Sequence, residues 1–418
     1  MLTTTVDYDD LVRPDAIHGS LYWDPQVFDD ELHNIWYRQW VYIGHDSEVA
    51  AAGTYVRKQL GTQPVILTRD ANGEVHVLFN RCAHLGNLVC HEQRGTANSI
   101  RCPFHGWTYR LDGSNIGVPY VQGYGPDFDK SSVGMARPPR VESHRGFVFA
   151  SMNPDVAPLI DFLGPAAGAL DDLCDLSPEG EIELTAGWVR HRTNANWKLG
   201  YEAALDGYHP RFVHRGLISL TSQTNFEMAT DKCPARVRSL GNGHGDVYWP
   251  LYYRDKGREF IWNNSSREKM PRYVDALEAR YGKERAHQIL VDGPPHIMIC
   301  PNLFVAELFI MVLEPVSPTC HNQIDTPIQW KGAFELNERN LRQTTASIGP
   351  AGMVLADDAA MAERVQRGLA AGQPEWLLRT RGGHRVERGE DGIIAGRLTD
   401  DAGILGFWEH YKKAMRAS

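Results

Sequence analysis

The arrangement of hydrophobic and polar residues predicts a domain of short β-strands in the first part of the chain. The runs 54–60 (TYVRKQL), 64–70 (PVILTRD) and 75–80 (VHVLFN) are rich in β-branched and apolar residues, and turn sequences containing Gly or Asp separate them. The run 145–152 (RGFVFASM) is typical of a closing strand. We therefore expect a β-rich domain over residues 38–156.

The remaining residues, 1–37 and 157–418, predict a second domain into which the first is inserted. A helical segment near 25–38 opens it, and apolar runs typical of strands are followed later by further helical segments. This order favours an antiparallel sheet packed on helices, so the predicted fold class is α+β. The strand-like runs are 182–193, 296–308, 309–318 and 323–334, and the later helical segments are 254–290, 338–345 and 407–416.

Two short motifs of cysteine and histidine lie within the β-rich domain. Cys82 and His84 form Cys-x-His, and after a spacer of seventeen residues Cys102 and His105 form Cys-x-x-His. Each motif supplies one thiolate and one imidazole, which suits a [2Fe–2S] cluster with both thiolates on one iron and both imidazoles on the other. The alternative is a structural zinc site, although zinc motifs usually take two cysteines from one turn and two histidines from a later helix.

A second group of metal-binding residue types follows in the stretch NWKLGYEAALDGYHPRFVH. Glu202, Asp206 and His209 are four and three residues apart, so on one helix they would share a face, and the proline after His209 would end or kink that helix. A chain that turns there brings His214 to the same point. Two imidazoles and one carboxylate form the facial triad of non-haem Fe(II) oxygenases. Two histidines at this spacing are by themselves more often ordinary residues, and the upstream motifs are what favour the metal site.

Taken together, these motifs resemble those of the large (alpha) subunit of the Rieske non-haem iron oxygenases, the ring-hydroxylating dioxygenase family. The resemblance extends over nearly the whole chain and includes CPFHGWTY, the NWK before the two histidines, and a late IGPAGMVLADDAAMAERVQRGL. It implies a helix-grip catalytic domain with an antiparallel sheet, which carries an inserted Rieske [2Fe–2S] domain. It also implies a mononuclear Fe(II) as the second metal cofactor.

The resemblance further implies roles for individual residues. The third iron ligand of this family is a carboxylate in a GPAG-type segment, and the register from that sequence favours Asp358 over Asp357. Asp357 is then expected to cap the helix that follows. The aspartate that corresponds to Asp206 is not a ligand in the family, and it implies a link from His209 to His105 of the partner subunit. Electrons would then cross between the subunits of a trimer or a multiple of one.

The implied reaction is the oxygenation of an aromatic substrate by O₂. Both oxygen atoms add to give a cis-dihydrodiol, or one atom adds in a monohydroxylation or a demethylation, and the same iron ligands serve each outcome. The resemblance implies that electrons come from NADH through a separate reductase, with or without a ferredoxin, because the chain has no glycine fingerprint for a nicotinamide or a flavin. A homotrimer and an α3β3 assembly with a small beta subunit are both compatible with it.

The late segments are most similar to the aromatic-acid branch of the family, the terephthalate, salicylate and benzoate types. A buried substrate carboxylate needs a cationic partner, and Arg397 is the candidate for that role, with an ordinary surface arginine as the alternative. The run 309–318 (FIMVLEPVSP) is apolar where a second arginine would serve an acid. Neutral and amino-substituted aromatics therefore stay open as substrates.

Composition limits the classes of binding partner that we expect and the cellular compartment in which we expect the protein. The chain has 43 Lys and Arg against 52 Asp and Glu, a net charge of −9, and no basic tract, so nucleic acid and anionic membranes are poor partners. No apolar run is long enough to span a bilayer, and the acidic N-terminal sequence lacks the pattern of a signal peptide. Of seven cysteines, only Cys82 and Cys102 fit a motif, which is typical of a reduced cytoplasmic protein.

Overall fold

The computed structural model describes residues 6–220 and 230–416 and divides the chain into two compact units. The smaller unit is Trp36–Leu159, and the larger unit combines Met1–Ile35 with Ile160–Ser418. A single continuous segment therefore interrupts the larger unit, and its ends lie beside the predicted limits of 38 and 156. Both units contain sheet and the larger one also contains long helices, so the predicted α+β class is confirmed.

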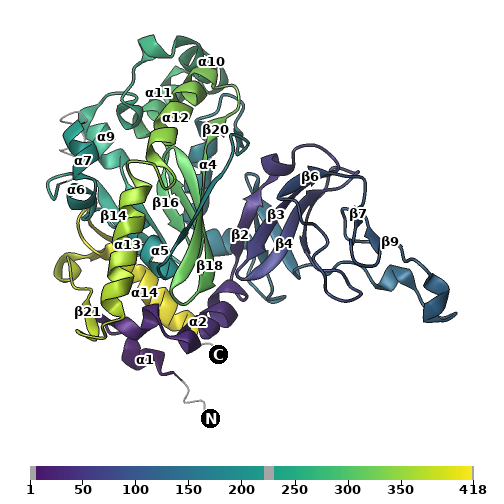
Figure 1. The fold of residues 1–418 in the computed structure, drawn as a ribbon. Helices are drawn as coiled ribbons and strands as arrows, with labels where there is room; N and C mark the ends of the chain where they lie inside the picture. The colour runs from purple at the N-terminus through teal and green to yellow at the C-terminus, as the bar shows by residue number, and fades with distance from the viewer. Residues whose placement is uncertain (1–5, 221–229, 417–418) are drawn as a thin grey trace. The chain divides into compact units, whose positions relative to one another are not determined.

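The smaller unit consists of short antiparallel strands in three sheets (Figure 1). The three expected strands at 54–60, 64–70 and 75–80 correspond to β3, β4 and β5 and share one sheet in the order β5-β4-β3-β6. The second sheet has the order β10-β11-β2 and the third has the order β7-β8-β9. The bounds are β2 (Val41–His45), β3 (Thr54–Leu60), β4 (Gln63–Arg69), β5 (Val75–Phe79), β6 (Arg94–Thr96), β7 (Ile100–Arg101), β8 (Thr108–Tyr109), β9 (Asn115–Gly117), β10 (Arg140–His144) and β11 (Phe147–Ser151).

The larger unit is built on a nine-stranded antiparallel sheet with the order β13-β19-β18-β17-β16-β15-β14-β23-β22. This sheet confirms the antiparallel arrangement that the apolar runs predicted. Two short pairs, β1 with β21 and β12 with β20, lie outside it. The bounds are β1 (Ala16–His18), β12 (Ile182–Glu183), β13 (Val189–Thr193), β14 (Arg236–Gly241), β15 (His244–Tyr248), β16 (His296–Ile299), β17 (Leu303–Ala306), β18 (Phe309–Ser317), β19 (Cys320–Pro327), β20 (Gln329–Trp330), β21 (Trp376–Leu378), β22 (Glu387–Arg388) and β23 (Ile394–Arg397).

Helices pack on this sheet and enclose the space in which the site lies. Helix α14 (Ala402–Met415) contacts β14, β15 and β23 through apolar residues at helical spacing, among them Phe407 and Tyr411, both fully buried. Helix α5 (Trp197–Ala204) contacts β18, and α13 (Leu355–Leu369) contacts α5. The other α-helices of this unit are α1 (Tyr8–Leu11), α2 (Pro25–Glu31), α3 (Leu159–Leu163, which begins at the boundary), α4 (Ala166–Asp175), α6 (Pro210–Val213), α7 (Arg215–Leu220), α9 (Pro250–Lys256), α10 (Pro271–Tyr281), α11 (Lys283–Asp292) and α12 (Phe334–Ser347).

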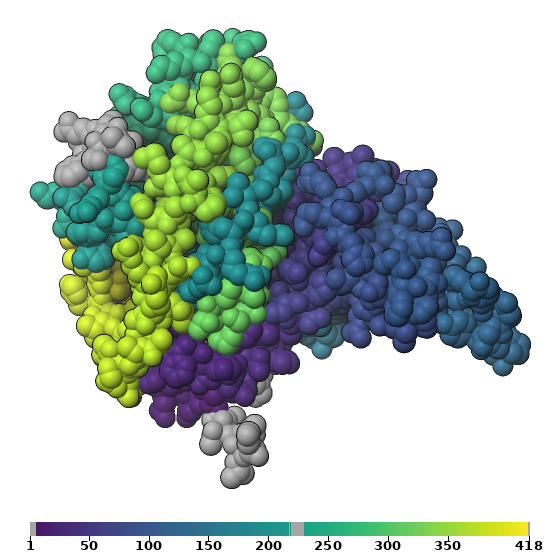
Figure 2. Space-filling model, viewed as in Figure 1, coloured from purple at the N-terminus to yellow at the C-terminus, as the bar shows by residue number. Residues whose placement is uncertain are grey.

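Helix α13 forms part of the surface of the larger unit. In Figure 2 this part of the chain is the yellow-green band, and it lies next to the green of α12. Within residues 6–220 and 230–416, no helix combines the length and the apolar character needed to cross a membrane.

Candidate functional site

The two cysteine–histidine motifs of the smaller unit occupy two turns of the same construction. In each turn the backbone N–H of the cysteine, Cys82 or Cys102, donates to the carbonyl five residues later at 2.8 Å. The backbone N–H of Gly86 or Gly106 then donates back to the carbonyl of the same cysteine. Both glycines have φ near +74°, a conformation in which a side chain would be strained, and this explains why a glycine closely follows the histidine of each motif.

These turns bring the four predicted cluster residues together. The imidazole rings of His84 and His105 have centroids 4.7 Å apart, while Cys82 and Cys102 are buried at 3% and 2% exposure. Burial alone would raise the pKa of the Cys102 thiol. Hydrogen bonds from the backbone N–H of Phe104 and from neighbouring groups outweigh burial and lower that pKa, which favours the thiolate that a metal requires.

In the larger unit, the predicted iron ligands His209 and His214 follow α5, and Asp358 lies on α13. The expectation that Glu202, Asp206 and His209 share one helix face was wrong, because α5 ends at Ala204. The chain turns there, and Asp206 Oδ1 accepts a hydrogen bond of 2.7 Å from the backbone N–H of Tyr208. An aspartate that bonds the backbone two residues later is typical of a turn and competes with helix.

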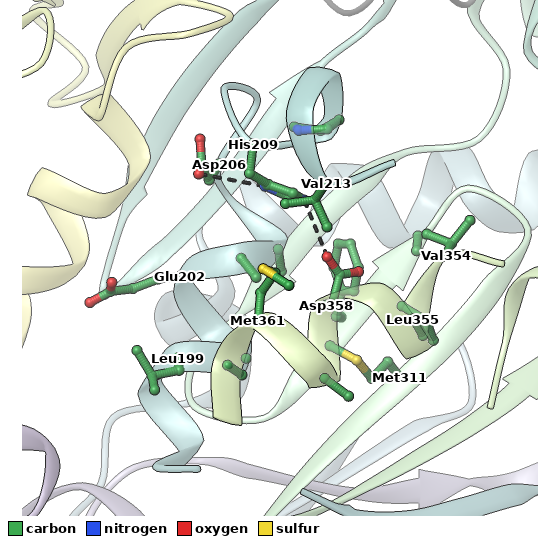
Figure 3. Close-up of a pocket in the computed structure, with 18 of the residues that line it drawn as sticks. Leu199, Glu202, Asp206, His209, Val213, Met311, Val354, Leu355, Asp358 and Met361 are labelled. Carbon is green, nitrogen blue, oxygen red and sulfur yellow. Dashed lines mark ion pairs between the residues drawn. The ribbon is translucent and has the colours of Figure 1, made fainter. Parts of the chain in front are cut away.

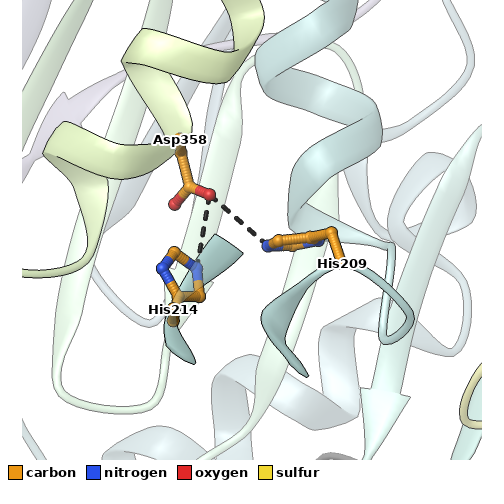
Figure 4. A group of neighbouring side chains, drawn as sticks. All are labelled: His209, His214 and Asp358. Carbon is orange, nitrogen blue, oxygen red and sulfur yellow. Dashed lines mark ion pairs between the residues drawn. The ribbon is translucent and has the colours of Figure 1, made fainter. Parts of the chain in front are cut away.

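His209, His214 and Asp358 nevertheless converge on one point (Figure 4). Asp358 Oδ1 lies 3.4 Å from His209 Nε2 and 3.3 Å from His214 Nε2. His209 comes directly before α6 and His214 directly after it, so this single short helix sets the spacing of the two imidazoles. Two nitrogens and one carboxylate oxygen within reach of each other match the donor set of a facial triad.

The two neighbouring aspartates on α13 differ in position. The Asp357 side chain is half exposed and lies 3.8 Å from His214 Nδ1, whereas the side chain of Asp358 points to the two imidazoles. The expectation that Asp357 caps α13 was wrong, because the helix begins at Leu355 and Val354 occupies the capping position. Both aspartates therefore belong to the first turn of α13, where a negative charge interacts favourably with the helix dipole and stabilises the helix.

The charges at this point favour a bound cation. Burial would lower the pKa of His209, but the carboxylates of Asp206 and Asp358 raise it to about 9. Burial would raise the pKa of Asp358, but hydrogen bonds with His209 and His214 lower it to about 2. The group therefore stays anionic at Asp358 and attracts a positive charge to the imidazoles.

The three residues line one cavity of about 440 Å³, shown in Figure 3. Asp206 lies beside His209, with Oδ2 3.5 Å from His209 Nδ1, and Asp358 reaches in from α13. Among the described lining residues, Arg379 is the sole Lys or Arg, and it already contacts Glu202 at 2.8 Å. Much of the wall is apolar and suits a ring; these residues are Leu199, Val213, Val247, Phe304, Phe309, Met311, Val354, Leu355, Met361, Ala362 and Val365.

Comparison with known proteins places both units in one family. Residues 39–129 match the model of the Rieske [2Fe-2S] domain, and residues 182–416 match that of the ring hydroxylating alpha subunit (catalytic domain), which covers more than half of the chain. The chain belongs to the ring-hydroxylating alpha-subunit family. It is thus a Rieske-type oxidoreductase, as the motifs predicted.

Individual relatives agree with this assignment along the full chain. The alpha subunit of toluate 1,2-dioxygenase from Pseudomonas putida is 29% identical over 96% of this chain and 92% of its own. The large subunit of anthranilate 1,2-dioxygenase from Acinetobacter baylyi is also 29% identical, over 96% and 91%. The crystal structure of naphthalene 1,2-dioxygenase from Rhodococcus sp. bound to indole matches with a TM-score of 0.83 at 25% identity, over 96% of this chain and 95% of that chain.

The family implies a [2Fe–2S] cluster and a mononuclear iron, and the residues of this ring-hydroxylating subunit fit both. Within the described part of the chain, the buried Nδ1 atoms of His84, His209 and His214 have no hydrogen-bond partner. The unpaired Nδ1 of His84 is a donor open to a cluster iron, whereas His209 and His214 turn their Nε2 atoms to Asp358 and would hold the mononuclear iron through these atoms. The buried thiols of Cys82 and Cys102 provide the soft donors that iron–sulfur clusters require.

The polar residues of the cavity differ from the one that the sequence suggested. Arg397 lies on β23 and is exposed, opposite Arg236 in the neighbouring strand, so the structure does not bring it to the cavity. Sequence reasoning missed Arg379 and the polar residues Thr193 and His321, which do line the cavity. A signal was available for His321, because the polar residues 321, 323 and 325 share one face of a strand that pairs with an apolar one.

Proposed function

We propose that this chain is the terminal oxygenase component of a multicomponent system that hydroxylates an aromatic substrate in aromatic catabolism. It would use O₂ and electrons that an NADH-dependent reductase supplies. The convergence of His209, His214 and Asp358 on a cavity with a largely apolar wall carries this proposal. The wall positions a flat ring and excludes water, while the three side chains provide the ligands at its polar side.

The metal groups have separate proposed holders. Cys82, His84, Cys102 and His105 would hold the [2Fe–2S] cluster, and His209, His214 and Asp358 the mononuclear iron. When bound, these groups supply electrons and activate dioxygen beside the ring. The protein positions the ligands of both groups. Short turns fix the thiolates and imidazoles, and α13 holds the carboxylate of Asp358 toward both histidines.

An aromatic carboxylate is the proposed substrate class, supported by the names of the toluate and anthranilate relatives. A neutral or amino-substituted aromatic is the second candidate, because Arg379 in the cavity is already bound to Glu202 and to the hydroxyl of Tyr22. Dihydroxylation, monohydroxylation and demethylation remain alternatives, since they use the same ligands.

Asp206 is proposed to connect two subunits. Its carboxylate faces His209, and its side chain is 27% exposed, so it can also meet a group from outside this chain. His105, exposed on its turn, is the proposed contact on the partner subunit. The assembly would then be a trimer or an α3β3 complex, with a reductase and, as a further option, a ferredoxin as electron donors. We also propose a cytoplasmic location, because NADH is present there.

The experiment combines metal analysis with a product screen. Anaerobically purified protein should contain three irons and two sulfides per chain and give a Rieske-type signal on reduction. Bound zinc without sulfide would contradict the cluster assignment. Supplied with a reductase, NADH and O₂, the enzyme is tested on aromatic acids and on neutral aromatics of matched size. Failure to oxygenate any of them, with both metal groups present, would exclude the proposed reaction.

A further inference from the structure

The cavity of the larger unit has a polar corner in addition to the His–Asp group. It consists of Thr193 on β13 with His321 and Gln323 on β19, and all three line the cavity. The antiparallel register places Thr193 directly opposite His321, so the two side chains lie on the same face of the sheet. The adjoining strand β18 contributes Phe309 and Met311 to the same cavity, so this wall changes from apolar to polar toward β13.

The hydroxyl of Thr193 is available to a ligand. Thr193 is 2% exposed, and within the described part of the chain its Oγ1 has no hydrogen-bond partner. Buried hydroxyls usually find a partner in the folded protein. A hydroxyl left open on the wall of a binding cavity therefore indicates a position that a ligand completes.

The two residues on β19 provide acceptors. His321 Nδ1 lies 2.7 Å from the carbonyl of Ala195, so Nδ1 carries the proton and Nε2 carries the lone pair. Burial lowers the pKa of His321 to about 4, which keeps the ring neutral. Gln323 Nε2 donates to Asp325 Oδ1 at 3.2 Å, which makes Oε1 the accepting end of the amide. The side chain also interacts with His191, and the carbonyl oxygen has a second lone pair for a ligand.

Of the other polar groups of the cavity, Glu202 and His296 are already engaged, whereas Trp249 Nε1 and Arg379 Nε have no hydrogen-bond partner among the described residues. The carboxylate of Glu202 accepts from the Tyr22 hydroxyl, the Trp408 indole and Arg379. His296 lies between Glu307 and the carbonyl of Ala204, at 3.0 and 2.9 Å. The corner is thus a place where a substituent of the substrate can form new hydrogen bonds without breaking existing ones.

We propose that the corner of Thr193, His321 and Gln323 binds an N–H donor substituent of the aromatic substrate, an amino or amide group, and thereby sets which ring carbons face the His209–His214–Asp358 group. Two acceptors and a hydroxyl match such a donor. A carboxylate would meet these lone pairs without a cation, which is unfavourable. On an amino-substituted aromatic acid, the amino group therefore occupies the corner.

This inference rests on the proposed function, and its test separates the two. Anthranilate and benzoate differ only in the amino group, so their dissociation constants are measured by calorimetry on the metal-loaded enzyme without reductase. Thr193→Val removes the hydroxyl at nearly constant volume, and Thr193→Ser retains it. Thr345→Val makes the same chemical change at an exposed site on α12 and serves as the matched control.

We expect Thr193→Val to weaken anthranilate binding about tenfold, the size of one lost hydrogen bond, and to leave benzoate within about twofold. Thr193→Ser should restore most of the anthranilate affinity, and Thr345→Val should change neither ligand. With O₂ and reductase present, Thr193→Val should also alter the ratio of the ring positions oxygenated. Gln323→Met, which removes an acceptor, gives the same comparison if Thr193→Val does not fold.

Equal losses for anthranilate and benzoate, or no loss for either, would overturn the inference, because the corner would then not distinguish the amino group. Wild-type enzyme that prefers benzoate over anthranilate would overturn it as well. If the ligands bind as expected but no aromatic compound is oxygenated, the proposed function fails while the recognition of the amino group stands.

Discussion

Two polar clusters, one at each end of helix α5, differ in whether their polar atoms are satisfied. At the start of the helix, the carboxylate of Glu31 accepts from Lys198, from the Trp197 indole at 2.8 Å and from the Tyr411 hydroxyl at 2.7 Å. Both Glu31 and Lys198 are fully buried. This closed cluster supplies every charge with a partner of its own.

The cluster beyond the other end of α5 is open. The Nε2 atoms of His209 and His214 lie 3.4 and 3.3 Å from Asp358 Oδ1, and the buried Nδ1 atoms of both rings have no hydrogen-bond partner among the described residues. Polar side chains packed this loosely would destabilise the fold if nothing else bound to them. The comparison suggests a rule for this protein. Buried polar groups that are fully hydrogen-bonded stabilise the fold, whereas buried polar atoms without partners beside a cavity indicate a site for a ligand.

The largest effect should come from removing one ligand of the open cluster. We expect Asp358→Ala to lose the mononuclear iron and to reduce product formation to background, because two imidazoles alone do not complete the triad. The iron of the cluster, two atoms per chain, should remain. Iron and sulfide analysis of the purified variant measures both quantities.

The adjacent carboxylate provides the control for that variant. Asp357→Ala removes the same group one residue earlier, from a half-exposed position on the same helical turn. It should retain the mononuclear iron and most of the activity. Loss of iron in Asp357→Ala with retention in Asp358→Ala would reverse the assignment of the ligand.

Breaking the closed cluster should instead affect stability. Lys198→Met leaves the carboxylate of Glu31 buried without its cation, which costs about 3–5 kcal/mol of unfolding free energy. The double variant Lys198→Met with Glu31→Gln removes both charges and should recover part of that loss. Chemical denaturation measures the free energies, and iron per folded chain should remain unchanged. Loss of iron at unchanged stability would contradict the structural role.

Asp206 combines features of the closed and the open cluster. Its Oδ1 accepts a hydrogen bond from the backbone, whereas its Oδ2 faces His209. Asp206→Asn keeps the size and loses the charge, so both metal groups should stay loaded. We expect cluster reoxidation to slow by about 10–100-fold, the usual effect of altering a residue that orients a metal-bound histidine. Rapid-mixing spectroscopy follows the cluster colour when substrate and O₂ are added. Unchanged reoxidation, or full activity in a monomer, would exclude the route between subunits.

Sequence reasoning was most successful where spacing along the chain defines the chemistry. The motifs of Cys82 and Cys102 are local turns, and their residues meet because each turn closes on its own glycine. The convergence of His209 and Asp358 required the family register, since 148 residues separate them along the chain and only the tertiary fold brings them to 3.4 Å.

Other features depended on tertiary structure and were not predictable in this way. The end of α5 at Ala204 reflects the hydrogen bond from Tyr208 to Asp206, which competes with a pattern that alone favours helix. Arg397 was chosen from its place in the sequence, and pairing in the sheet leaves it exposed. Arg379 follows β21, and nothing in the sequence around it indicates that it reaches Glu202, far along the chain.

A buried histidine whose two ring nitrogens are both hydrogen-bonded is held in one protonation state. His244 is such a residue, and its stability contribution can be tested by pH. Its Nε2 donates to the carbonyl of Phe162 at 2.9 Å, while Nδ1 accepts from the backbone N–H of Cys300 at 3.0 Å. A proton on Nδ1 would break the second bond. Burial is the main cause that lowers the pKa of His244 to about 3, from the 6.5 of an exposed histidine.

The direction of the resulting pH dependence follows from proton binding. Between about pH 6.5 and 3 the unfolded chain binds a proton at His244 that the folded chain does not, so stability falls as the pH falls, by about 1.4 kcal/mol per unit, and levels off below 3. His244→Gln has no titrating group there. Wild type should therefore lose about 2 kcal/mol relative to this variant between pH 6.5 and 5, measured by denaturation at each pH. Parallel stability curves for the two proteins would show that His244 accepts a proton in the folded state and that this buried site is open rather than closed.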